Sequence, residues 1–176
     1  MDYVYLVASL PGLELTAPPV ISSDELLAST AGVLRPDHRE DLRAVLEDRP
    51  QDLRSRAAGP YVDAETQLRN ALAQARASRA GRRHDARPHG GFEMRAVAVA
   101  ERAMELDDPA ARELMLDRFR WRLLDELSFS PPFGFQAVLA YAFKLRLAEK
   151  WAAMDETRGL AMASGLVEEA LAGSVP

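Results

Sequence analysis

The stretch FQAVLAYAFKL (residues 135–145) comes shortly after Pro131, Pro132 and Gly134 and indicates the fold. Proline fixes φ and removes an amide donor, so the break predicts that a new helix starts behind it. The apolar residues then cover so much of the helix circumference that the helix must be buried on several sides. We therefore expect it at the centre of a mainly α-helical bundle. Its apolar arc comprises Phe135, Val138, Leu139, Ala142, Phe143 and Leu145.

Three longer helices are predicted before this central one. Residues 62–80 contain neither Gly nor Pro, and Gly81 can supply the left-handed residue that ends a helix. Residues 92–106 show the next helical pattern, and Asp108 followed by Pro109 is typical of a cap and a first turn. The helix behind that cap has apolar residues at spacings of three and four. These are Leu116, Phe119, Leu123 and Leu127.

The first 60 residues are divided by prolines into shorter elements. The opening YVYLV (residues 3–7) has β-type side chains without alternation, so a short strand and a first helical turn both remain open. Ser22 and Glu25 form a capping box for a helix over residues 23–31. Pro36 can occupy the first turn of a further helix, which ends before the next proline.

The predicted elements form a single helical domain over residues 1–176, with about six to seven helices. Residues 1–60 supply the short elements and residues 61–176 the long-helix bundle. At the end of the chain, Asp155 or Thr157 is expected to start a separate last helix, because both side chains favour cap positions.

Composition excludes several classes of protein. The chain has 176 residues, which suffices for one core, and its net charge of −5 argues against a surface built to hold nucleic acid. It has no cysteine, which excludes disulfides, thiolate catalysis and Cys-type zinc sites. The longest uncharged run, residues 128–143, is interrupted by proline and glycine, so we expect no membrane span and a cytoplasmic protein.

Positive charge gathers in the middle of the chain, where residues 61–106 hold eight basic and six acidic side chains. This pattern is typical of a solvated helix end, and it also suits an acidic protein partner. Nucleic acid fits less well because no aromatic residues are interleaved for stacking. The candidate interface residues are Arg76, Arg79, Arg82, Arg83 and Arg87.

No catalytic or cofactor site is expected. His84 and His89, with Asp85 between them, do not have the spacing of a zinc framework, and neighbouring arginines repel a divalent ion. Adjacent acidic pairs on a helix point to different faces. No glycine-rich phosphate loop or nucleophile motif is present.

Three segments, the second of which has two parts, together resemble a bacterial family, DUF2764, which accompanies V/A-type ATPase components and is similar to the C subunit of these ATPases, named d in eukaryotes. They are YVYLVASLP (3–11), ETQLRNAL (65–72), RASRAG (76–81) and FGFQAVLAYAFKL (133–145), and they occur in the expected order. The C subunit is helical and forms a socket between the proteolipid ring and the central stalk. The resemblance therefore implies a non-catalytic adaptor, peripheral at the inner face of the cell membrane through the ATPase.

The resemblance also implies structural roles for the polar residues of these segments. We expect them to make contacts between helices rather than contacts with a ligand. They are Glu65, Arg69, Asn70, Tyr141 and Lys144.

Two questions stay open at this point. The C subunit has three related helical units, and 176 residues are too few for all three. The chain is then either a reduced adaptor, a protein that self-associates, or one with another role in the complex. The alternative from a different class of function is a regulatory module that binds a nucleotide or nucleic acid through the arginine-rich loop.

Overall fold

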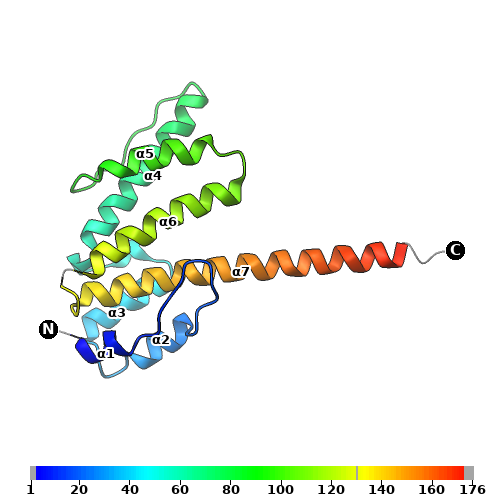
Figure 1. Ribbon diagram of the computed structural model, residues 1–176. Helices are drawn as coiled ribbons and strands as arrows, with labels where there is room; N and C mark the ends of the chain where they lie inside the picture. Colours follow the sequence, from blue (N-terminus) through cyan, green and yellow to red (C-terminus); the bar gives the residue numbers. More distant parts are fainter. Residues whose placement is uncertain (1–2, 130, 173–176) are drawn as a thin grey trace.

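The computed structural model describes residues 3–129 and 131–172, with side chains up to residue 155. Over these residues the chain forms seven α-helices, two 3-10 helices and no strand, which confirms the mainly α-helical bundle (Figure 1). Within the same part of the chain, no helix combines the length and the apolar character that crossing a membrane requires. The α-helices are α1 (Val4–Ser9), α2 (Ser23–Ser29), α3 (Pro36–Leu46), α4 (Gly59–Arg79), α5 (Met94–Glu105), α6 (Pro109–Ser128) and α7 (Phe135–Ala172), and the 3-10 helices are η1 (Pro50–Asp52) and η2 (Arg56–Ala58).

The predicted helix ends are largely confirmed. Ser22 and Glu25 make both hydrogen bonds of the capping box at the start of α2. Asp108 caps α6 by accepting two backbone N–H groups, at 3.0 and 3.1 Å. Gly81 follows α4 with a φ of +64°, the left-handed conformation that glycine adopts without strain. Pro60 lies in the first turn of α4, so this helix begins three residues before the predicted start.

The opening segment is helical, which answers the question left open at residues 3–7. Tyr3 is buried, and its backbone N–H donates to the carbonyl oxygen of Phe133 at 2.6 Å. Its hydroxyl lies 2.7 Å from Nδ1 of His38, whose ring stacks on that of Phe135. These contacts fix α1 against the start of α7 and the side of α3.

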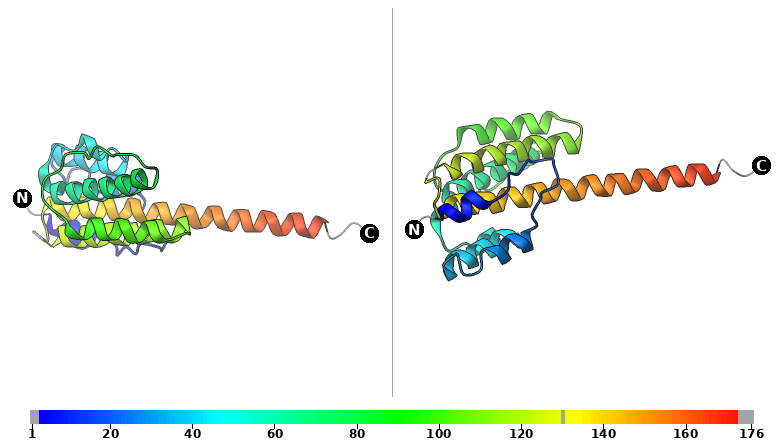
Figure 2. Two further views of the ribbon diagram at one scale, coloured as in Figure 1. Left: turned by 90° about the horizontal axis from the view of Figure 1, so that it is seen from above. Right: turned by 60° about the horizontal axis from the view of Figure 1, so that its bottom comes forward.

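The first half of α7 lies at the centre of the molecule. It packs against α6 on one side and against α3 and α2 on the other, while α5 packs against α4 and α6 (Figures 1 and 2). Val138, Leu139, Ala142 and Leu145 are completely buried. The prediction of a central helix at residues 135–145 is therefore confirmed.

The separate last helix was a wrong prediction, because α7 continues through Asp155 and Thr157 to Ala172. Cap residues start a helix only where the preceding chain is broken, and no Gly or Pro occurs between Phe135 and Thr157. A single glycine such as Gly165 costs a helix about 1 kcal/mol and does not end it. The later part of α7, drawn orange to red, extends away from the body (Figures 1 and 2). At a rise of 1.5 Å per residue, residues 152–172 span roughly 30 Å.

Candidate functional site: a charged cleft between α4, α6 and α7

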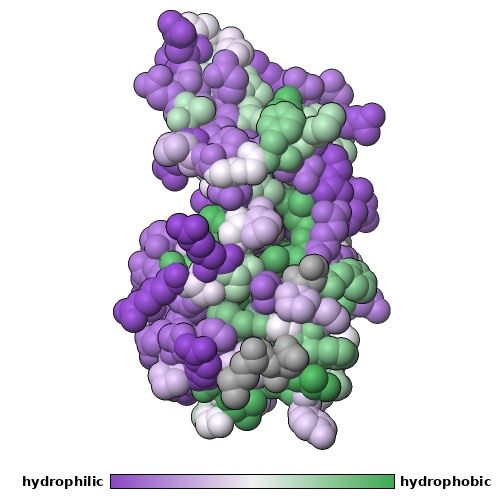
Figure 3. Space-filling model, turned by 90° about the vertical axis from the view of Figure 1, so that its left-hand side faces the viewer, coloured by the Kyte–Doolittle hydropathy of each residue, from purple (hydrophilic) through white to green (hydrophobic). Residues whose placement is uncertain are grey.

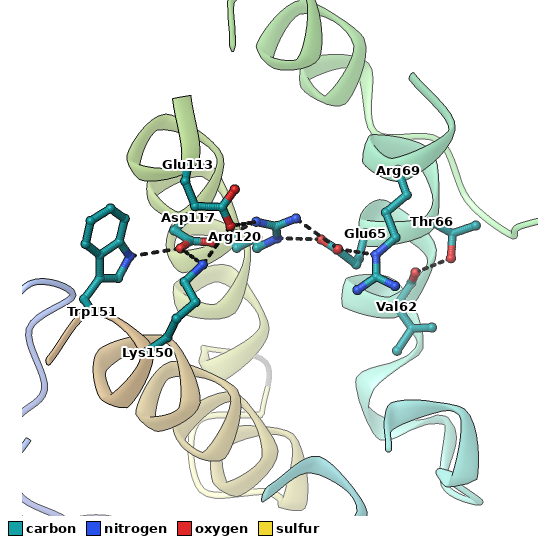
Figure 4. Close-up of polar contacts among 9 residues, drawn as sticks. All are labelled: Val62, Glu65, Thr66, Arg69, Glu113, Asp117, Arg120, Lys150 and Trp151. Atoms are coloured by element: carbon teal, nitrogen blue, oxygen red, sulfur yellow. Dashed lines mark hydrogen bonds and ion pairs between the residues drawn. The ribbon is translucent and has the colours of Figure 1, made fainter. Parts of the chain in front are cut away.

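A carboxylate of α6, that of Asp117, is completely buried where α6 meets α7. It accepts hydrogen bonds from Nη1 of Arg120 at 2.7 Å and from Nε1 of Trp151 at 2.9 Å, and Lys150 also contacts it (Figure 4). A buried charge is tolerated when cationic and polar donors surround it in this way. Asp117 therefore anchors α7 at the point where that helix leaves the body.

Arg120 carries the same network from α6 to α4. Its Nε and Nη2 atoms donate to the two carboxylate oxygens of Glu65, at 2.9 and 3.2 Å, and Glu65 also accepts from Arg69 at 2.6 Å (Figure 4). Such a bidentate pair fixes orientation as well as distance. Burial alone would lower the pKa of Arg120, but the carboxylates of Glu65 and Asp117 outweigh burial and raise that pKa.

Charges in this network are matched. Lys150 donates to Glu113 at 2.7 Å, and Arg120 lies 3.7 Å from the same carboxylate. Three carboxylates thus face three cations across three helices. A general base needs a carboxylate that is available to a substrate, and here each carboxylate already accepts from a cation. The arrangement favours a clamp between helices over acid–base chemistry.

Beside the network lies a cleft of about 460 Å³, open on one side. Val62, Phe143 and Leu147 form its apolar wall, and the ring of Tyr61 packs against Phe143 with the centroids 4.7 Å apart. The Tyr61 side chain is only 7% exposed, and burial, reinforced by Glu65, raises the pKa of its hydroxyl. Within the described residues this hydroxyl makes no hydrogen bond.

The loop between α4 and α5 is held in place by one face of α4. Asp63, Gln67 and Asn70, at spacings of four and three, each accept a backbone N–H from this loop. The amide of Asn70 also donates back to the loop at 2.9 Å, so the contact is reciprocal. The three donors are Gly90 (2.8 Å), Glu93 (2.8 Å) and Arg87 (2.9 Å).

The five candidate arginines are all exposed, but they make different contacts. Arg76, Arg82 and Arg83 are exposed around the end of α4. Arg79 is exposed as well, and it also donates to the backbone oxygen of Met104 at 2.7 Å, which ties α4 to the end of α5. Arg87 lines the cleft, because Asn70 fixes its backbone there.

The remaining predicted residues lie apart from the cleft. Lys144 pairs with Asp125 and lies 5.0 Å from the ring centroid of Trp121. The hydroxyl of Tyr141 is buried without a hydrogen bond among the described residues, and burial raises its pKa to about 12. Both residues line a smaller pocket of about 310 Å³.

The loop that carries His84 and His89 forms no metal centre among the described residues. His84 and His89 flank Asp85 as the sequence requires, and Nε2 of His84 is buried without a partner in the part of the chain that is described. Among those same residues, no group of three or more His, Asp or Glu side chains is placed to hold a metal ion.

The end of the body at which α7 begins exposes apolar side chains among polar ones (Figure 3). Tyr5 of α1 is 93% exposed and Phe129, at the end of α6, is 75% exposed. Phe133 is partly exposed and is tied to the same end by the bond from Tyr3. Monomeric proteins seldom leave large contiguous apolar patches in water without a function.

The residues at the centre of the site were not predicted from the sequence. Glu65 and Arg69 were among the expected polar contacts, but Asp117, Arg120 and Lys150 were not. A signal was present, since Asp117 and Arg120 are three residues apart among the buried leucines of α6. A charged pair at that spacing on an apolar face indicates a buried network.

Comparison with known proteins identifies the family. The family model described as "Protein of unknown function (DUF2764)" matches residues 61–173, well over half of the chain. The chain belongs to this family. The DUF2764 match includes all but the first two residues of α4 and the whole of α5, α6 and α7, and hence every residue of the charge network. Neither the curated proteins nor the solved structures gave a match.

Proposed function

We propose that this DUF2764 protein is a non-catalytic component of a V/A-type ATPase, acting as an adaptor between the central stalk and the proteolipid ring in the manner of the C subunit. The resemblance of its motifs to proteins that accompany such ATPases supports the choice of complex. The helical body with its charge-matched network supports the non-catalytic role. The observation that carries the adaptor role is the geometry of α7.

An adaptor must contact two components at a fixed separation, and α7 suits this task. Its first half is the centre of the body, and Trp151, with its indole bound to Asp117, is buried where the helix leaves it. The rest of α7 extends away from the body (Figures 1 and 2). Most of the stability of helices in proteins comes from packing against other elements, so we expect a partner to pack on this part of α7.

The exposed arginines at the end of α4 give the body a second contact. Arg76, Arg82 and Arg83 complement an acidic surface, which increases the specificity and the rate of docking more than the affinity. The same arginines support the rival function, a module that binds a nucleotide or nucleic acid. The two differ in salt dependence, because binding to a polyanion weakens steeply with salt.

The test is affinity purification of the tagged full chain from its native cell. We expect ATPase stalk and ring subunits to co-purify at constant stoichiometry. The double variant Arg82→Glu/Arg83→Glu should lower their recovery, whereas Arg122→Glu, an exposed arginine on α6, should not. Consistent absence of ATPase subunits contradicts the proposal. Salt-sensitive binding to heparin at physiological ionic strength, with no ATPase subunit recovered, favours the nucleic-acid module.

A further inference from the structure

We propose that the cleft between α4, α6 and α7 binds an acidic segment of a partner protein, which places a carboxylate between Arg69 and Arg87 and an apolar side chain against Phe143 and Leu147. This inference rests on the proposed adaptor role and adds the chemistry of the partner. It concerns the cleft and not the arginines at the end of α4.

Two cations of the cleft have free donor groups. Arg69 is 62% exposed and uses only its Nε in the bond to Glu65, so its terminal amino groups remain available. Arg87 is exposed, and among the described residues no carboxylate pairs with its guanidinium. Its backbone is bonded to Asn70 through both N–H and C=O, which keeps the side chain at the cleft. Ordering Arg87 beforehand reduces the entropy that binding would otherwise cost.

Of the carboxylates that line the cleft, only Glu65 pairs with either arginine, and it does so through Nε of Arg69 while it also accepts from Arg120. Asp117 is completely buried under Arg120, Lys150 and Trp151, and Glu113 pairs with Lys150. Asp48 follows the end of α3 and lines the cleft, but it pairs with neither arginine among the described residues. An incoming anion therefore meets free guanidinium groups on the α4 and loop side, where bidentate contacts to a carboxylate are possible.

The Tyr61 hydroxyl is the second observation that points to a ligand. The side chain is 7% exposed, lines the cleft and lies close enough to Glu65 and Arg120 for their charges to act on its pKa. Among the described residues the hydroxyl has no hydrogen-bond partner, and it is not one of the fully buried unpaired atoms, so it is available to a group that enters the cleft. A carbonyl or carboxylate oxygen of a bound segment would accept from it.

The shape of the cleft favours a protein segment over a small anion. Small-molecule sites enclose most of their ligand, whereas this cleft is open and the two arginines with free donor groups that line it are exposed. An apolar pocket with a charged rim is the usual arrangement where a side chain of one protein is anchored in another. The volume of about 460 Å³ accommodates a few side chains.

The experiment uses the full chain in its native cell, with a photoreactive residue in place of Gln51, an exposed residue that lines the cleft. Crosslinked peptides are identified by mass spectrometry in the wild-type, Arg87→Glu and Arg118→Glu backgrounds. Arg118 is an exposed arginine on α6 outside the cleft and serves as the matched control. We expect a crosslinked peptide with Asp or Glu beside an apolar residue, about tenfold weaker in Arg87→Glu and unchanged in Arg118→Glu.

Three crosslinking results overturn the inference. They are no crosslink in the wild type, a crosslink of equal yield in Arg87→Glu, and a crosslinked peptide without a carboxylate side chain. Displacement by millimolar inorganic phosphate or ATP, with no acidic peptide found, assigns the cleft to a small anion and also overturns it. An acidic peptide from a protein outside the ATPase leaves the cleft assignment standing and contradicts only the proposed function.

Discussion

Arg120→Met removes the centre of the charge network while keeping a side chain of similar length. Three hydrogen bonds to carboxylates are lost, two to Glu65 and one to Asp117. Bonds to charged groups contribute about 1.5–3 kcal/mol each if taken singly, but the values are not additive. Both carboxylates keep other donors, Arg69 on Glu65 and Trp151 with Lys150 on Asp117. We therefore expect a loss of about 3 kcal/mol, the lower end of the range for breaking a buried ion pair.

Urea unfolding followed by far-UV circular dichroism at pH 7 measures this loss. For a chain of this size, about 3 kcal/mol corresponds to a fall in Tm of roughly 6–12 °C. Arg118→Met is the matched control, since Arg118 is exposed on the same helix, and it should cost less than about 0.5 kcal/mol. Glu65→Gln should also cost less in the Arg120→Met background than in the wild type, because the two residues interact. Equal losses for the Arg118 and Arg120 variants would refute the reasoning.

Three further predictions address local features. The pKa of Glu93 is lowered from 4.5, first by its hydrogen bond to Arg95. The Glu93 carboxylate therefore makes its full contribution to the free energy of unfolding above pH 4.5, and this contribution is lost as the pH falls through the lowered pKa. Glu93→Gln should therefore cost about 0.5–1 kcal/mol at pH 7 and converge with the wild type in acid urea titrations; a constant difference would be inconsistent with this. Gly81→Ala forces a non-glycine residue into φ +64° and should cost about 1 kcal/mol, whereas Gly12→Ala, in open space without a positive φ, should be near neutral by the same thermal assay. Asn70→Ala should increase the hydrogen-exchange rate of the Arg87 amide several-fold and leave that of Gly90, held by Asp63, much less affected; equal acceleration of both would disprove a separate clamp.

Local signals in the sequence predicted the fold well. The capping residues Ser22 and Asp108 and the terminating Gly81 each act on backbone groups within a few residues, so no knowledge of the tertiary structure is needed to interpret them. The signal at Asp155 failed because a cap residue has no effect inside a helix whose preceding turns are intact. A continuous run without Gly or Pro before Asp155 was the stronger evidence.

The site was harder to predict because its contacts join distant parts of the chain. Glu65 and Arg120 are 55 residues apart, and Asp117 and Trp151 are 34 apart. Which charged side chains meet is decided by how α4, α6 and α7 pack, and the charges of a single sequence do not fix that packing. The contact between Asn70 and the backbone of Arg87 was equally hard to predict. A polar residue on a helix surface is normally solvated, so the sequence alone does not indicate that Asn70 holds a loop.

The central claim is that the body and the projecting part of α7 contact different components of a V/A-type ATPase. Crosslinking in the native cell from photoreactive residues placed at Asp155, exposed just beyond the body, and separately at Arg83 tests it most directly. We predict that the two sites crosslink to two different subunits of the stalk and the ring. Crosslinks from both sites that never include an ATPase subunit would contradict the claim.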